Sequence, residues 1–199
     1  MSEKEYCSAE LSADVLKDGL TSVIAEAGLN LSILARQGCI CCDVGAGAEI
    51  LAMNDYQPRI LIASEPLGSH NERKKIETSL AKVKTMAPVE LIRDHPEAAL
   101  QLCARKKIKV GLVTWLNIFP EKYYRESFID FFKLAKPLLI NGGAAVASVD
   151  WIDPGYWGGP GELVMAMNPV AALGYKVDCL DRENGNSAGG VFLIGTKLS

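Results

Sequence analysis

The stretch Cys39-Ile40-Cys41-Cys42-Asp43-Val44-Gly45-Ala46-Gly47 decides the fold of this chain. Its apolar first half is short and ends at a turn, which favours a strand that is buried on both faces. The two glycines predict a tight turn from this strand into a helix expected at 48–54. In open α/β sheets a ligand binds in the crevice beyond the carboxyl ends of such strands. The stretch therefore predicts the central strand of an α/β sheet with a ligand crevice at its end.

Outside this stretch, short apolar runs alternate with amphipathic segments. Six more runs predict strands at 59–64, 89–92, 109–114, 144–149, 175–180 and 191–195. The segments between them predict helices at 48–54, 71–84, 96–105 and 123–135. Buried strands joined by helices indicate a parallel sheet with helices on both faces. The polar, glycine-rich segment 181–190 is typical of an antiparallel hairpin between the last two runs.

Length and composition set the limits of the interpretation. The chain has 199 residues, of which 49% are hydrophobic and 23% charged, as expected for one globular domain that buries a core. We expect a single domain over 1–199, with a helical extension at 1–36 and a ligand-binding core at 37–199. The net charge of −3 argues mildly against a protein built to wrap nucleic acid, but it leaves room for a local basic patch.

Three of the six cysteines lie together in Cys39-Ile40-Cys41-Cys42. Side chains alternate along a strand, so Cys39 and Cys41 are expected on one face and Cys42 on the other, which is a poor arrangement for a metal ion. We expect buried, reduced thiols and no metal site. The charged N-terminus shows no signal peptide and no apolar stretch predicts a membrane span, so the expected location is cytoplasmic.

Charge around the first turn selects among nucleotide ligands. A dinucleotide places its pyrophosphate at the helix N-terminus, and the corresponding third glycine position holds Ile50. Asp43 and Glu49 flank the turn and would repel a pyrophosphate, whereas a ligand with sulfonium and ammonium groups is compatible with them. Glu65 lies 20 residues after Gly45, the spacing at which an acid binds ribose hydroxyls. These features favour S-adenosylmethionine over NAD.

At these motifs the chain resembles the class I S-adenosylmethionine-dependent methyltransferases over about residues 38–197. Asp43-Val44-Gly45-Ala46-Gly47 resembles the D-x-G-x-G loop of that family, Glu65 its ribose-binding acid and Asp94 its adenine-side acid. The resemblance implies a seven-stranded, mostly parallel sheet in the order 3-2-1-4-5-7-6, with strand 7 antiparallel. It also implies a methyltransferase that binds S-adenosylmethionine through Asp43, Gly45, Ala46, Gly47, Glu65, Pro66, Asp94, His95, Thr114 and Trp115.

Two positions depart from the family pattern. Glu49 stands where many members have a third glycine, and the fourth strand ends in Thr114-Trp115 rather than in an acid. The missing acid argues against the magnesium-dependent branch and leaves the catalytic residues unassigned. Methyl transfer depends largely on positioning, so a reactive acceptor needs no catalytic base.

The acceptor is expected to bind the loops after the fourth and fifth strands. Aromatic rings in these loops suit a small organic acceptor, or a small moiety of a larger one. The candidate substrate residues are Asn117, Tyr123, Tyr124, Trp151, Tyr156 and Trp157. Rings also stack on bases, so an RNA- or protein-directed enzyme is the first alternative, and a non-catalytic scaffold or partner subunit is the second. The sequence leaves the oligomeric state open, a homo-oligomer included.

Overall fold

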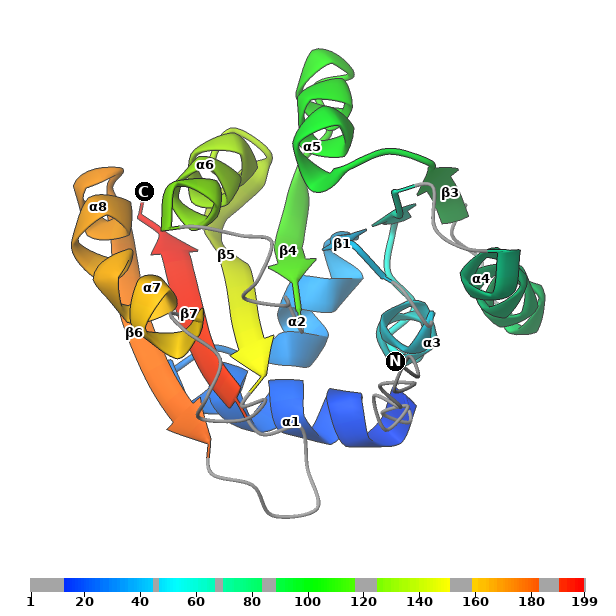
Figure 1. Ribbon diagram of the computed structural model, residues 1–199, viewed down its shortest axis with the longest axis horizontal. Helices are drawn as coiled ribbons and strands as arrows, with labels where there is room; N and C mark the ends of the chain where they lie inside the picture. The colour runs from blue at the N-terminus through cyan, green and yellow to red at the C-terminus, as the bar shows by residue number, and fades with distance from the viewer. Residues whose placement is uncertain are drawn as a thin grey trace, which may run out of the picture.

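The computed structural model describes residues 13–44, 47–66, 70–83, 89–116, 125–150, 159–182 and 190–198. Seven strands form one sheet in the order β3-β2-β1-β4-β5-β7-β6 (Figure 1). They are β1 (Cys39–Cys42), β2 (Leu61–Ser64), β3 (Val89–Ile92), β4 (Val110–Trp115), β5 (Leu139–Asp150), β6 (Tyr175–Arg182) and β7 (Gly190–Lys197). Strand β7 is antiparallel to β5 and β6, and the other pairs are parallel. The predicted order and strand directions are confirmed.

Helices cover both faces of the sheet. One face packs against α1 (Ala13–Glu26), α2 (Leu31–Arg36), α3 (Ala48–Asn54) and α4 (His70–Lys82). The other face packs against α5 (Pro96–Arg105), α6 (Arg125–Ala135), α7 (Gly159–Met165) and α8 (Met167–Ala172). None of the helices in the described ranges is long and apolar enough to cross a membrane.

Strand β1 separates two hydrophobic clusters. Its side chains alternate, so Cys39 and Cys41 belong to the cluster under α1–α4 while Ile40 and Cys42 belong to the cluster under α5–α8. All four residues are fully buried. The expectation of buried thiols on opposite faces is therefore confirmed, and burial raises the pKa values of these thiols.

Two features of the fold differ from the sequence prediction. Strand β5 begins at Leu139 rather than at 144, and it includes Asn141-Gly142-Gly143 as a bulge. The register shows this bulge, because Val110 pairs with Leu139 and Leu112 pairs with Ala144. The second difference is the helix pair α7 and α8, which fills most of the segment between β5 and β6 and was not predicted.

Aromatic side chains join α6 to the hairpin of β6 and β7. The rings of Phe132 and Tyr175 meet edge to face with centroids 5.7 Å apart. The buried hydroxyl of Tyr175 donates a hydrogen bond of 2.8 Å to the carbonyl oxygen of Phe132, just before the end of α6. The same carbonyl oxygen accepts a 3.0 Å hydrogen bond from the backbone N–H of Lys136, so the tyrosine hydroxyl adds a second donor from the hairpin.

Tyr175→Phe is expected to lower the free energy of unfolding by about 1 kcal/mol, because it removes this buried hydrogen bond while the carbonyl of Phe132 keeps its bond from Lys136. Urea unfolding followed by circular dichroism measures the change. Tyr56→Phe is the matched control, because the Tyr56 hydroxyl makes an exposed contact with Thr21 and its loss should change stability much less. Equal effects of the two substitutions would contradict the prediction.

Candidate functional site

The carboxyl ends of β1, β2 and β3 place three acidic residues along one edge of the sheet. Asp43 follows β1, Glu65 follows β2, and Asp94 lies two residues beyond β3. These strands pair in parallel and in register, Cys42 with Ser64 and Ser64 with Ile92, so their ends lie side by side. The structure thus brings the three predicted acids to neighbouring positions at one edge.

Gly47, the residue before α3, is tightly packed. Gly47 adopts a φ of 77°, and its N–H donates a 2.8 Å hydrogen bond to the carbonyl oxygen of Val44. A Cβ atom at this position would lie 2.5 Å from Oγ of Ser79 on α4. Both the backbone conformation and the contact with α4 therefore require glycine. Asp43, which is half-buried, begins the turn with a φ of 58°.

The end of β2 holds Glu65 in a buried position, with 8% of its surface exposed. Its backbone N–H donates a 3.0 Å hydrogen bond to the carbonyl oxygen of Ile92, which fixes the end of β2 against β3. Pro66 follows and is half-buried. A buried carboxylate at the end of a parallel strand is well placed to accept hydrogen bonds from ligand hydroxyls.

Asp94 and His95 form the junction between β3 and α5. Both are exposed, and Oδ1 of Asp94 accepts a 2.8 Å hydrogen bond from the backbone N–H of His95. His95 is the N-cap residue of α5, and Pro96 occupies the first turn, where its missing N–H costs nothing. The second carboxylate oxygen of Asp94 remains available for a ligand at this edge.

Glu49 is the feature of this region that sequence reasoning missed. It was expected to flank the turn as a charged group, but it lies in the first turn of α3 with 4% of its surface exposed. Its carboxyl group accepts hydrogen bonds from the hydroxyl of Thr114 on β4 and from the thiol of Cys41 on β1. Burial raises the pKa of Glu49 from 4.5 to about 7. The residue at the third-glycine position therefore joins α3 to the two central strands.

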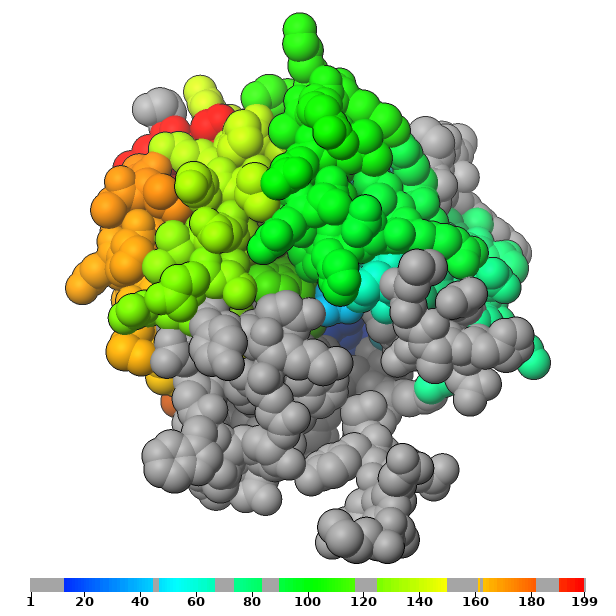
Figure 2. Space-filling view, turned by 45° about the horizontal axis from the view of Figure 1, so that its top comes forward, coloured from blue at the N-terminus to red at the C-terminus, as the bar shows by residue number. Residues whose placement is uncertain are grey.

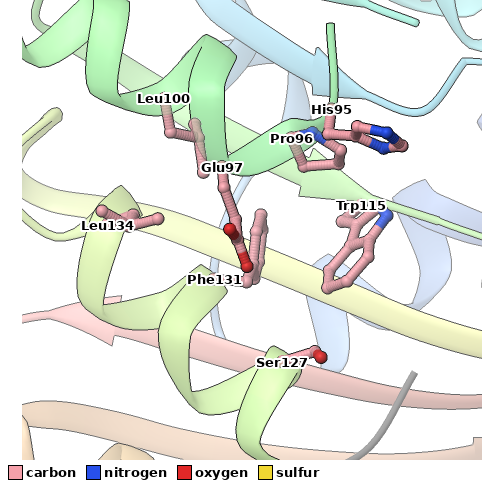
Figure 3. Close-up of a pocket in the computed structure, with 8 residues that line it drawn as sticks. All are labelled: His95, Pro96, Glu97, Leu100, Trp115, Ser127, Phe131 and Leu134. Atoms are coloured by element: carbon pink, nitrogen blue, oxygen red, sulfur yellow. The ribbon is translucent and has the colours of Figure 1, made fainter. Parts of the chain in front are cut away.

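A cavity of about 210 Å³ lies between α5 and α6, next to the end of β4 (Figure 3). Trp115 forms part of its wall and packs against Phe128 and Phe131, with ring centroids 5.8 and 5.5 Å apart. The remaining wall is mostly apolar, with a few polar groups at the rim. It consists of His95, Pro96, Glu97, Leu100, Ser127, Phe131 and Leu134. Such a lining suits a small, flat organic group.

Several predicted site residues lie outside the residues that the structure describes. They are Gly45 and Ala46 of the first turn and the candidate substrate residues Asn117, Tyr123, Tyr124, Trp151, Tyr156 and Trp157. The described residues near the predicted acids are Thr114, which is fully buried against Glu49, and Trp115 at the cavity.

The fold matches that of known methyltransferases. A putative rRNA methylase from Clostridium thermocellum superimposes with a TM-score of 0.65 at 12% identity, covering 90% of this chain and 96% of its own. An S-adenosylmethionine-dependent methyltransferase from Clostridium acetobutylicum gives 0.64 at 8% identity, covering 96% and 94%. Fibrillarin from Aeropyrum pernix, with natively bound S-adenosyl-L-methionine, gives 0.60 at 11% identity, covering 89% and 74%. No protein-family model matches the sequence, and no curated protein matches it significantly.

These similarities establish the fold class: the chain has the class I methyltransferase fold. The antiparallel β7 between β5 and β6 distinguishes it from the dinucleotide-binding sheet, whose order is 3-2-1-4-5-6. The predicted fold is therefore confirmed at the level of strand order and direction.

The buried carboxyl of Glu49 makes stability depend on pH. Between pH 4.5 and about 7 the folded protein retains a proton that the unfolded chain releases, so stability falls as the pH rises through this interval. Glu49→Gln removes the ionisation and should stabilise the protein by about 3 kcal/mol at about pH 8, with little effect at about pH 5. Urea unfolding at the two pH values measures this difference.

Glu97→Gln is the matched control, since Glu97 is exposed at the start of α5 and should show no comparable gain at high pH. A Glu49→Gln variant whose stability relative to wild type is the same at both pH values would contradict the assignment of a raised pKa to Glu49.

Proposed function

We propose that this protein is an S-adenosylmethionine-dependent methyltransferase. The observation that carries the proposal is the row of Asp43, Glu65 and Asp94 at the carboxyl ends of β1, β2 and β3, in a sheet with the methyltransferase strand order. A ligand that offers hydroxyl and amino groups and carries positive charge matches such a row of acceptors.

The residues at this edge fit the parts of the cofactor in chain order. We assign the ribose hydroxyls to Glu65, the adenine side to Asp94 and His95, and the positively charged methionine end to the turn from Asp43 to Gly47. Pro66 adds half-buried apolar surface next to Glu65, Trp115 is assigned to the cofactor from the end of β4, and Thr114 hydrogen-bonds to Glu49 in the first turn of α3. When bound, S-adenosylmethionine supplies an electrophilic methyl group.

For the chemistry, the chain contributes chiefly position. The edge built by the ends of β1, β2 and β4 would hold the donor, so that its methyl group faces an acceptor held beside the first turn. We propose a small-molecule acceptor, or a small moiety of a larger molecule, because the sequence that follows β4 and β5 is rich in aromatic residues, which suit a compact organic group. No general base is assigned among the described residues, which suits an acceptor that is nucleophilic without deprotonation.

Binding of S-adenosylhomocysteine to the purified protein tests the donor site by isothermal titration calorimetry. We expect a saturable heat of binding for the wild type. Glu65→Ala should weaken binding about tenfold or more, because the variant loses a buried carboxylate that is proposed to accept from ribose hydroxyls. Glu26→Ala, an exposed carboxylate on α1, is the control and should bind like the wild type.

The result of the binding experiment distinguishes an enzyme from a non-catalytic scaffold. Absence of binding by a folded wild-type protein would overturn the enzyme hypothesis and favour a scaffold. Binding that survives Glu65→Ala would overturn the assignment of Glu65. Once binding is established, transfer of a labelled methyl group to small acceptors or to bulk RNA identifies the acceptor class.

A further inference from the structure

The amino edge of the sheet, opposite the row of acids, carries a row of cations. Arg59 lies shortly before β2, Lys109 directly before β4, and Lys136 shortly before β5. Lys197 ends β7, whose antiparallel direction brings its carboxyl end to this edge. Four cations from separate parts of the sequence thus lie along the same edge, at the ends of β4, β5 and β7, which are neighbours, and of β2, which lies beyond β1. We call Arg59, Lys109, Lys136 and Lys197 the amino-edge cations.

Backbone carbonyl groups hold these side chains in place. The Nζ atom of Lys197 donates to the carbonyl oxygen of Leu139 at 2.7 Å, and that of Lys109 donates to the carbonyl oxygen of Pro137. Lys136 donates to the carbonyl oxygen of Leu173, and a guanidinium nitrogen of Arg59 donates to that of Lys109 at 2.8 Å. Each cation is therefore positioned by a neutral acceptor that leaves its charge uncompensated.

Acidic partners are missing from this row. Within the ranges that the structure describes, none of the four cations forms an ion pair with a carboxylate, whereas Lys17, Arg93 and Lys106 elsewhere each do. Burial lowers the pKa of Lys197, and the nearby charges of Lys109 and Lys136 lower it further. The ammonium group of Lys197 therefore lies close enough to those of Lys109 and Lys136 to be repelled by them.

We propose that the amino-edge cations form a binding surface for the phosphodiester backbone of RNA. Phosphate oxygens accept hydrogen bonds from lysine and arginine, and a bound polyanion would relieve the repulsion along the row. From β2 to β7 the row crosses four strand spacings, about 20 Å, which matches about five or six nucleotides of one RNA strand. Figure 2 shows segments from the green, yellow and red parts of the chain meeting along the upper rim, where this edge lies.

The arrangement favours a linear polyanion over a membrane surface. Lys136 and Lys197 are partly buried and bonded to carbonyl groups of the protein. A narrow strand that runs along the edge can approach these partly buried groups more closely than a flat lipid surface can. The inference stands apart from the proposed methyl transfer, since none of these residues lies at the carboxyl edge and binding needs no methyl donor.

Fluorescence anisotropy with a labelled RNA of about 20 nucleotides, over about 50 to 200 mM salt, tests the proposal. The wild type should bind with an affinity that falls steeply with salt. The triple variant Lys109→Gln, Lys136→Gln, Lys197→Gln should bind at least tenfold more weakly, and its salt slope should be smaller by about 2, because each lysine contacts about one phosphate of a single strand. Thermal melting verifies that the triple variant is folded. If it is unfolded, the single variant Lys109→Glu, at an exposed position, tests the same surface.

The matched control is Lys74→Gln, Lys75→Gln, Lys82→Gln on α4, which removes the same charge from another exposed surface. It should retain wild-type RNA binding. Three results would overturn the proposal: no RNA binding by the wild type, a loss of binding in the α4 variant instead, or a preference for vesicles of anionic phospholipid over RNA. The amino-edge variant should still bind S-adenosylhomocysteine. A loss of RNA binding with this binding retained concerns the amino-edge cations alone and does not bear on the methyl-donor proposal.

Discussion

The burial of β1 on both faces is the constraint on which the rest of the structure depends. A strand whose four residues are all inaccessible to water needs a helical layer on each side and a paired strand on each edge. β2 and β4 pair with its edges, and two hydrophobic clusters, one on each face, include its alternate side chains. Because β1 is held on both faces and both edges, Asp43, which directly follows it, lies at the centre of the carboxyl edge, and Gly47 lies at the start of α3. The rigidity of the candidate site therefore follows from the hydrophobic effect acting on a strand that itself has no polar side chain.

Glu49 shows how this constraint acts on a charged residue. Packing α3 against β1 and β4 places the first turn of the helix over the sheet, so a side chain at position 49 must point into the interior. Glycine would fill this position at no electrostatic cost. Glutamate fits because Thr114 and Cys41 hydrogen-bond to its carboxyl group, yet desolvation still outweighs these bonds and raises its pKa to about 7. The residue thus loses much of the negative charge that the sequence ascribes to it, and the acidity of the carboxyl edge rests on Asp43, Glu65 and Asp94.

Most of the fold can be predicted from the sequence because the turn residues and the spacing of apolar residues indicate the same helices and strands. The bounds of α3 and α5 follow from Gly47 and Pro96, whose backbone preferences suit helix starts. The early start of β5 escaped prediction because Gly142 and Gly143 favour a turn, and only pairing with β4 turns them into a bulge. The burial of Glu49 escaped because its partner Thr114 lies 65 residues away. The roles of the site residues remain predictions, and the amino-edge cations could not be predicted because only the folded sheet brings them together.

Charge is divided between the two edges of the sheet in a way that the strand directions explain. In a parallel sheet every loop that follows a strand lies at one edge and every loop that precedes a strand lies at the other. Acids that follow β1, β2 and β3 are therefore gathered together, and so are cations that precede β2, β4 and β5. The antiparallel β7 adds Lys197 to the basic edge because its end, not its beginning, lies there. The strand reversal that distinguishes this fold from the dinucleotide-binding sheet thus also extends the basic row. A neutral or cationic ligand at one edge and a polyanion at the other would meet opposite fields, and β4, about 20 Å long, keeps them from competing.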